Sequence, residues 1–266
     1  MSTSSSWIKP REAGAQAAAI RSYFDAESDE YAKRRAEEFS FIAQKRIALE
    51  LLPPRMARVL DIGCGPAVLA EDLLARADEY CGIDLSPEMI ARASAHMASH
   101  PQRERCSLSV GEAQALGFAD ASCDAIVALG LLEYLPSYEG ALREMWRVLR
   151  SGGVAVLAVP NRRSAYRTCR RFADRARNGL KRLLGRPPRA SERFHCNPCV
   201  PAQLDDELRA VGFEKAAGRY CNFILYPLHD LHARASLALN RALSRLEPLP
   251  LAPLLGAQYV VAARKP

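Results

Sequence analysis

The chain has 266 residues, of which 49% are hydrophobic and 25% are charged. This is the composition of an ordinary globular protein, and it excludes a disordered, collagen-like or disulfide-scaffold chain. The formal net charge is +7, but residues 161–200 hold twelve basic and two acidic side chains, so they carry +10 and the remainder carries −3. The basic character therefore belongs to one segment, and it does not by itself demand a nucleic-acid partner.

Three features of the sequence indicate a cytoplasmic protein. No apolar run approaches the roughly 18–20 residues that a membrane-spanning helix needs. Residues 1–10 lack the basic start and apolar middle of a secretory signal. The eight cysteines are scattered without the spacing of a disulfide framework, which is typical of reduced and mostly buried thiols.

The predicted elements begin, after a polar and loose segment at 1–12, with a helical pattern over 13–52 that ends at Pro53 and Pro54. Short apolar runs then alternate with helical patterns. Strands are predicted over 58–63, 79–84, 107–110, 125–129 and 154–159, and helices over 67–77, 87–97 and 138–149. This alternation predicts a parallel sheet with helices on both of its faces.

Two inserts interrupt the alternation, at about 161–200 and at about 223–256. The first holds a predicted helix over 165–184, and the second a predicted helix over 228–246. The regular pattern resumes with a helix over 201–211 and with strands over 213–220 and 258–263. The predicted organisation is an N-terminal helical part, 1–52, followed by one domain, 53–266, that carries both inserts.

The strongest chemical signal is a pair of short motifs, Val59–Pro66 and Gly82–Ser86. A strand that enters a glycine turn before a helix allows close approach of the backbone to a nucleotide-like ligand. Asp84 ends the next predicted strand, where its carboxylate can accept hydrogen bonds from both hydroxyls of a ribose. A dinucleotide site would have a third glycine where Val68 stands. The pattern therefore favours a ligand that contains a ribose without a diphosphate.

These motifs, with three others that follow in order, resemble the class I S-adenosylmethionine-dependent methyltransferases, and in particular the small-molecule group that includes the ubiquinone and menaquinone methyltransferases. The resemblance runs from about Arg58 to Val159 through the segments 60–65, 83–89, 110–113, 122–135 and 149–154. It implies a seven-stranded, mostly parallel Rossmann-like sheet, with the two helical inserts forming a cap over the pocket. It also implies S-adenosylmethionine as the cofactor.

The resemblance assigns cofactor-binding roles to ten residues. Three should surround the methionine part of the cofactor, Asp84 should hold the ribose, two should flank the adenine, and two should face the adenine edge. Leu129 and Tyr31 complete the set, Tyr31 on an N-terminal helix that closes over the cofactor or else packs in the core. The three residues around the methionine part are Asp61, Gly63 and Gly65. The two that flank the adenine are Leu85 and Met89, and the two at the adenine edge are Glu112 and Ala113, with Glu112 replacing the usual Asp.

The catalytic residues carry a weaker signal. Methyl transfer from a sulfonium needs a base only when the acceptor must lose a proton, and positioning supplies much of the acceleration. Glu133 follows the predicted fourth strand and is one candidate, with loop capping as its alternative role. His195 in the first insert is a second candidate, and a surface or packing role is its alternative. For His229 and His232 in the second insert, the same alternatives apply, a catalytic base or a surface or packing residue.

Cys196, Cys199 and His195 form a pattern that invites a metal interpretation. No second cysteine pair follows at zinc spacing, so no metal is predicted. The Arg-rich helix of the first insert is predicted to carry one apolar stripe with basic residues on its other sides. It is interpreted as a lid, a membrane-surface patch, or a grip on an acidic substrate or carrier protein. The stripe consists of Tyr166, Cys169, Ala173, Ala176, Leu180 and Leu183.

The function predicted from the resemblance is methyl transfer to a small or lipophilic metabolite, with oxygen as the first choice of acceptor atom. The acceptor is expected to be a small molecule, lipophilic or acidic in character. Transfer to nitrogen or carbon, RNA methylation and non-catalytic cofactor binding are the alternatives. A nucleic-acid partner is disfavoured because residues 130–134 lack the Asn or Asp, Pro, Pro, aromatic motif of enzymes that methylate the amino groups of bases.

Overall fold

The computed structural model describes residues 10–184, 199–228, 232–247 and 249–266. Seven strands form one sheet in the order β3-β2-β1-β4-β5-β7-β6. Neighbours from β3 through β5 run parallel, and β7 lies antiparallel between β5 and β6. The prediction of a mostly parallel, seven-stranded sheet is confirmed. The strands are β1 Met56–Ile62, β2 Ala77–Asp84, β3 Cys106–Val110, β4 Cys123–Leu129, β5 Leu149–Pro160, β6 Glu214–Phe223 and β7 Gly256–Arg264.

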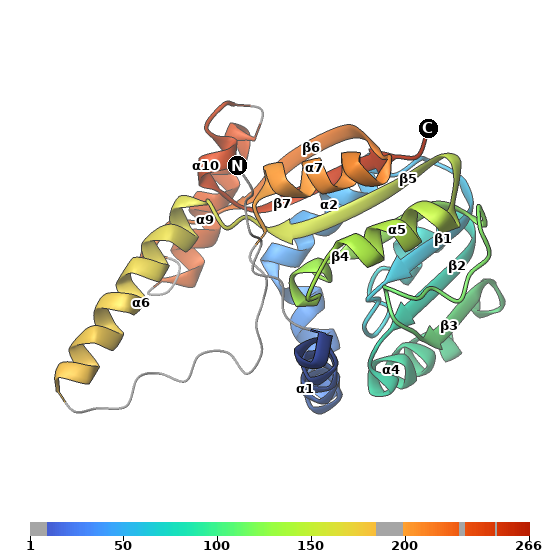
Figure 1. Cartoon of the computed structure of the whole chain (residues 1–266), viewed down its shortest axis with the longest axis horizontal. Helices are drawn as coiled ribbons and strands as arrows, with labels where there is room; N and C mark the ends of the chain where they lie inside the picture. The colour runs from blue at the N-terminus through green and yellow to red at the C-terminus, as the bar shows by residue number, and fades with distance from the viewer. Residues whose placement is uncertain (1–9, 185–198, 229–231, 248) are drawn as a thin grey trace.

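Helices cover both faces of the sheet (Figure 1). The central strands are continuous apolar runs, so neighbouring residues point into opposite layers: Val59 packs with α2, α3 and α4, whereas Leu60 packs with α5 and α7. The helices are α1 Pro10–Glu37, α2 Phe39–Leu51, α3 Ala70–Leu74, α4 Pro87–Ala98, α5 Glu139–Val148, α6 Ala165–Leu183, α7 Pro201–Val211, α9 Ala233–Leu243 and α10 Ala252–Leu255, with short 3₁₀ turns η1 Arg103–Arg105, η2 Leu132–Tyr134 and η3 Ser244–Leu246. Within the described ranges, none of the helices combines the length and the apolar character that crossing a bilayer requires.

Several element boundaries differ from the prediction. The helical stretch predicted over 13–52 is two helices, because Glu38 has extended backbone angles, and α1 already begins at Pro10. α3 is shorter than predicted because Ala67, with φ of 59°, belongs to the turn that precedes it. β5 starts earlier than predicted because residues 149–153 already pair with neighbouring segments of the sheet. Leu149 pairs with Cys123 of β4, and the N–H of Gly152 donates to Lys265 O at 2.7 Å. In the second insert α9 is confined to Ala233–Leu243.

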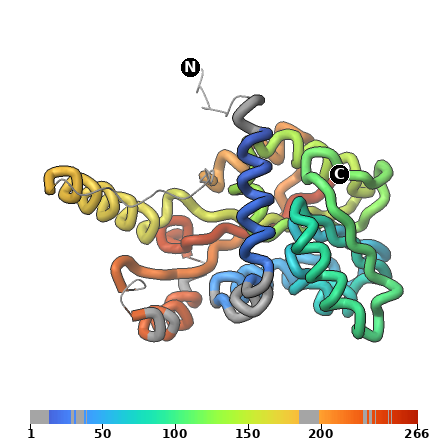
Figure 2. Tube along the Cα trace, turned by 90° about the horizontal axis from the view of Figure 1, so that it is seen from below, coloured from blue at the N-terminus to red at the C-terminus, as the bar shows by residue number. Residues whose placement is uncertain are grey.

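The described helix of the first insert does not fold over the sheet. α6 projects away from the body of the protein, and both views show its far end standing apart from the other helices (Figures 1 and 2). The cause lies at its base, where Asn161 is tied to the β7 side: its N–H donates to Ala257 O at 2.9 Å and its amide group to Gly256 O at 2.9 Å. The helix that crosses the carboxyl ends of the parallel strands is α1 instead (Figure 2).

Candidate active site

A cavity of about 520 Å³ lies at the carboxyl ends of β1, β2 and β4, with residues of α1 forming one wall. This volume falls within the roughly 300–1,000 Å³ that is typical of small-molecule sites. All ten residues predicted to bind the cofactor line it, so the structure brings together residues from five segments of the chain. They are Tyr31, Asp61, Gly63, Gly65, Asp84, Leu85, Met89, Glu112, Ala113 and Leu129.

The glycine turn after β1 forms the floor of the cavity. Gly63 and Gly65 both have left-handed backbone angles, with φ of 73° and 53°. The N–H groups of Gly63 and Cys64 donate to Ile83 O at 2.8 and 3.0 Å, which ties the turn to the end of β2. A Cβ atom at Gly63 would lie 3.1 Å from Cδ1 of Leu131, another cavity residue. The turn therefore needs glycine both for its conformation and for its close approach to the opposite wall.

Asp84 is held in place by the backbone on both sides of its strand end. Its carboxylate accepts hydrogen bonds from the N–H of Gly65 and the N–H of Ser86, each at 2.9 Å. Burial raises the pKa of this carboxyl, while the hydrogen bonds from Ser86 and Gly65 act in the opposite direction. Because each carboxylate oxygen can accept more than one hydrogen bond, Asp84 keeps capacity for a ligand with two neighbouring hydroxyls.

Asp61 places a second carboxyl on the cavity wall. The residue is buried, and the hydroxyl of Tyr80 donates to its Oδ2 at 3.0 Å. The pKa of the Asp61 carboxyl is raised to about 7, chiefly by burial and also by the nearby charge of Asp84, while the hydrogen bond from Tyr80 acts in the opposite direction. A ligand ammonium group bound here would favour the ionised carboxylate, since an opposite charge stabilises the charged form.

The wall formed by α1 is fastened to the loops that follow the strands. Gln16 donates to Tyr134 O at 3.0 Å, and the hydroxyl of Ser86 donates to Asp25. The ring of Phe24 meets the ring of Tyr134 edge-on, with centroids 5.3 Å apart. The sequence analysis singled out none of the cavity residues Arg21, Phe24 or Tyr134. Phe24 and Arg21 show only the three- and four-residue spacing of any amphipathic helix, which does not distinguish a cavity wall from a core contact.

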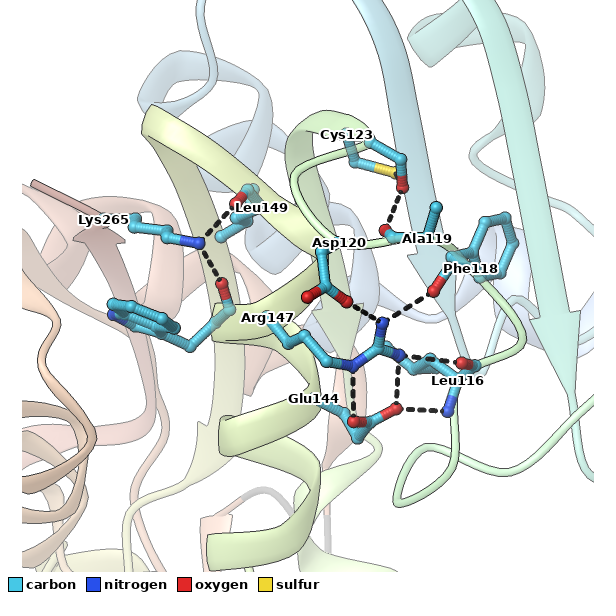
Figure 3. A network of polar contacts seen from close by, with 11 residues as sticks. Leu116, Phe118, Ala119, Asp120, Cys123, Glu144, Arg147, Leu149 and Lys265 are labelled. Carbon is cyan, nitrogen blue, oxygen red and sulfur yellow. Dashed lines mark hydrogen bonds and ion pairs between the residues drawn. The ribbon is translucent and has the colours of Figure 1, made fainter.

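The loop that follows Glu112 and Ala113 is supported from behind by Arg147 (Figure 3). Its guanidinium donates to Leu116 O at 2.9 Å and to Phe118 O at 2.8 Å, and it pairs with Asp120 and Glu144. Glu144 in turn accepts a hydrogen bond from the N–H of Leu116 at 2.7 Å. Since this loop follows directly after Glu112 and Ala113, the network on α5 fixes where these two cavity residues lie.

Glu133 lies outside the cavity. Its neighbours Leu131 and Tyr134 are lining residues, but Glu133 is not among the described residues that form the wall. Its carboxylate faces the packed layer of α5 and α7, where burial, with the charges of Glu207 and Glu133, raises the pKa of the Cys199 thiol to about 12. The geometry therefore does not support Glu133 as a general base.

The other candidate catalytic and metal residues contribute less. His195, Cys196 and His229 lie outside the described residues, so the role considered for each remains a prediction. His232 is exposed at the start of α9. Among described residues, no group of three or more His, Cys, Asp or Glu side chains is arranged to hold a metal ion.

Of the described residues in 161–200 and 223–256, none lines the cavity, and α1 forms one of its walls. Because both inserts include residues outside the described ranges, the cap stays a prediction. The inserts leave the sheet beside β7 and β6, on the far side of β4 from the cofactor motifs, so their described parts do not reach the β1 and β2 ends.

Comparisons with known proteins agree with this geometry. Residues 60–157 match the model of a family described as a methyltransferase domain. A ubiquinone biosynthesis O-methyltransferase of Azorhizobium caulinodans is 30% identical over 167 residues, which are 63% of this chain and 62% of that protein. A demethylmenaquinone methyltransferase of Desulfitobacterium hafniense is 36% identical over 101 residues, 37% of this chain and 40% of that one. Residues 60–157 are thus a methyltransferase domain similar to those of the class I S-adenosylmethionine-dependent enzymes.

Solved structures share the fold of this chain. A methyltransferase structure from Thermotoga maritima aligns with a TM-score of 0.61 at 20% identity, covering 93% of this chain and 100% of that one. The [4+2]-cyclase SpnF aligns with a TM-score of 0.57 at 21% identity, covering 84% and 80%. At these identities the likeness concerns the fold. The chain matches 62% of the length of its Azorhizobium relative, so the two sequences are alike in the central domain and not throughout.

The cofactor of the family, S-adenosylmethionine, fits the residues that are present. The turn at Gly63 and Gly65 has no side chains that would fill the cavity floor. Asp84 offers a fixed carboxylate to a ribose, and the buried Asp61 offers one to an ammonium group. Met89 and Ala113, both buried, provide the apolar surfaces that a planar base requires.

Proposed function

We propose that this methyltransferase transfers the methyl group of S-adenosylmethionine to a hydroxyl oxygen of a small, lipophilic metabolite. The observation that carries the proposal is a single cavity in which the ten motif residues meet an apolar wall. Phe24, Leu131 and Leu135 contribute apolar side chains to that wall, which suits a lipophilic acceptor. The choice of oxygen is supported by the Azorhizobium relative, which is named as an O-methyltransferase.

When bound, the cofactor supplies an electrophilic methyl group on a sulfonium. The acceptor oxygen would take this methyl group as the carbon–sulfur bond breaks, and the hydroxyl proton would pass to solvent or buffer. The residues of the chain would act by orientation: Asp84 would hold the ribose, Asp61 would hold the ammonium group, and α1 would form one wall beside the reacting atoms. Alignment of two bound reactants can supply a large share of the acceleration without a base.

The acceptor class can be tested directly with methyl-labelled cofactor. An alkylcatechol, an alkylaniline of matched chain length and a bulk RNA sample serve as three acceptor probes. We expect label in the alkylcatechol, with one S-adenosylhomocysteine formed for each methyl transferred. Transfer to the aniline alone would overturn the oxygen assignment, and transfer to RNA alone would overturn the small-molecule assignment.

Cofactor binding without methyl transfer is the second candidate, because a protein named for a different reaction, a [4+2]-cyclase, shares this architecture. In the same assay it predicts cofactor binding, measured by calorimetry, without label in any probe. That pairing of results would overturn the proposed activity.

The position of Glu133 leads to a prediction about catalysis. We expect Glu133→Gln to leave turnover of the alkylcatechol within about threefold of the wild-type value, since its carboxylate lies outside the cavity. Glu112→Gln, which alters a carboxylate on the cavity wall, is the matched variant and should raise the KM for the cofactor. Loss of about 100-fold or more in kcat for Glu133→Gln would restore Glu133 as a general base.

A cytoplasmic location is part of the proposal. The seven cysteines within the described residues are all free thiols, and most of them are buried. Structural disulfides persist mainly in oxidising compartments, so seven free thiols fit a reducing one. The proposed partner of the active site is a small molecule, and the role of the basic insert is considered separately below.

A further inference from the structure

The helix α6 combines a firmly attached base with a far end that stands apart from the other described parts of the protein. At the base, Ser164 caps the helix by accepting from Arg167 N–H at 3.4 Å, and Tyr166 is buried. The Arg167 side chain also donates to Ala257 O at 3.4 Å. Beyond this first turn the helix projects from the body, as Figures 1 and 2 show. At about 1.5 Å per residue, its 19 residues extend about 28 Å.

The two sides of α6 differ in chemistry. At about 3.6 residues per turn, the basic residues fall on one half of the helix and the apolar residues on the other. Phe172 joins the apolar half that the sequence pattern predicted. The basic half holds Arg167, Arg170, Arg171, Arg175, Arg177, Lys181 and Arg182, and the apolar half holds Cys169, Phe172, Ala173, Ala176, Leu180 and Leu183.

The apolar half is exposed to solvent. Phe172 is 65% exposed, Leu180 is 57% exposed and Leu183 is 85% exposed. A helix that served as a lid would bury these side chains against the domain, because burial of apolar area is the main gain available to it. The lid interpretation therefore does not account for the outer part of α6.

The charge of α6 indicates what covers this face. Its seven basic residues stand against one acid, Asp174, which lies 3.1 Å from Arg177 and 3.9 Å from Arg170. The net charge of +6 on one helix matches an anionic surface. An RNA backbone would satisfy the basic half and leave Phe172, Leu180 and Leu183 in water. A bilayer with anionic headgroups satisfies both halves, since its interface offers negative charge beside an apolar interior.

We propose that α6 docks in the interface of an anionic lipid bilayer, with its apolar half inserted and its basic half at the headgroups. The helix lies in the membrane plane in this arrangement and does not span the bilayer. The proposal does not depend on the methyl-transfer activity, because vesicle binding requires neither cofactor nor acceptor. The docked protein would then encounter a lipid-soluble acceptor at the bilayer in which that acceptor is dissolved.

Vesicle co-sedimentation of the full chain tests the proposal. The probes are vesicles of phosphatidylcholine alone and of phosphatidylcholine with phosphatidylglycerol, each at low salt and at 1 M salt. We expect the wild type to bind the anionic vesicles at least tenfold more tightly than the neutral ones at low salt. The electrostatic part should weaken at 1 M salt, where the screening length falls to about 3 Å. Equal, negligible binding to both vesicles would overturn the proposal.

Two pairs of variants assign the binding to α6. The first pair begins with a triple variant of α6, Arg171→Gln, Arg175→Gln and Arg182→Gln combined. It should reduce vesicle binding at least tenfold, since each basic residue near an anionic surface contributes about 1 kcal/mol. The control with the same net charge changes three exposed arginines elsewhere, Arg103, Arg143 and Arg209, to Gln and should bind like the wild type.

The second pair tests the apolar half. Leu183→Ser should weaken binding severalfold, whereas Ile42→Ser, at an exposed apolar position of α2, should not. Equal effects within either pair would overturn the assignment to α6. Tight binding to an RNA of similar charge with no binding to vesicles would show that the surface serves nucleic acid instead.

Discussion

Asp84→Ala is expected to weaken binding of S-adenosylhomocysteine by about 10- to 150-fold, which corresponds to the roughly 1.5–3 kcal/mol of a hydrogen bond to a charged group. The reason is the double role of this carboxylate. It faces the cavity as the acceptor for the ribose, and it accepts the N–H groups of Gly65 and Ser86 at 2.9 Å. Its removal takes away the ligand contact and releases the two loops that it joins. Titration calorimetry of the purified protein measures the effect.

Two controls separate these roles. Asp84→Asn keeps an oxygen acceptor without the charge, so it should lose less affinity than Asp84→Ala. Asp78→Ala changes an exposed carboxylate at the other end of β2 and should leave affinity unchanged. An Asp84→Ala protein that remains folded and binds with the wild-type affinity would contradict the assignment of Asp84 to the ribose.

Gly63→Ala is expected to reduce cofactor affinity by about 100-fold and to lower the free energy of unfolding. At φ of 73° the added Cβ costs about 1–2 kcal/mol in backbone strain. The same Cβ would lie 3.1 Å from Leu131 Cδ1 across the cavity floor, so that side chain must shift into the space used by the ligand. Calorimetry measures the affinity, and chemical denaturation measures the stability.

Gly152→Ala is the matched control for Gly63→Ala. Gly152 has a similar φ of 79°, but a Cβ there would meet no atom within 4 Å, and the residue is distant from the cavity wall. Both variants should lose a similar amount of stability from strain, and only Gly63→Ala should lose cofactor affinity. Similar affinity losses in the two variants would mean that the turn matters only through general stability.

The sequence alone determined the cofactor side of this site. Each motif joins the end of a strand to the start of a helix, and local patterns of apolar runs, glycine and capping residues identify such joints. In a parallel sheet the carboxyl ends of the strands meet at one edge, so Gly63, Asp84 and Glu112 come together once the strand order is known. The family resemblance implied a seven-stranded, mostly parallel sheet, which the structure confirms, and the structure then supplied the strand order.

Only the tertiary structure decided the remaining features. The direction of the Glu133 side chain depends on how η2 turns after β4. Its neighbours Leu131 and Tyr134 line the cavity, whereas Glu133 lies near Cys199 in the layer of α5 and α7. The wall residues Arg21 and Phe24 depend on where α1 crosses the sheet, which their helical spacing cannot specify. The apolar stripe of α6 was visible in the sequence, but its exposure was not. An amphipathic pattern indicates that burial of one helix face against an apolar partner is favourable, whereas the long-range packing of the chain determines whether the protein itself provides that partner.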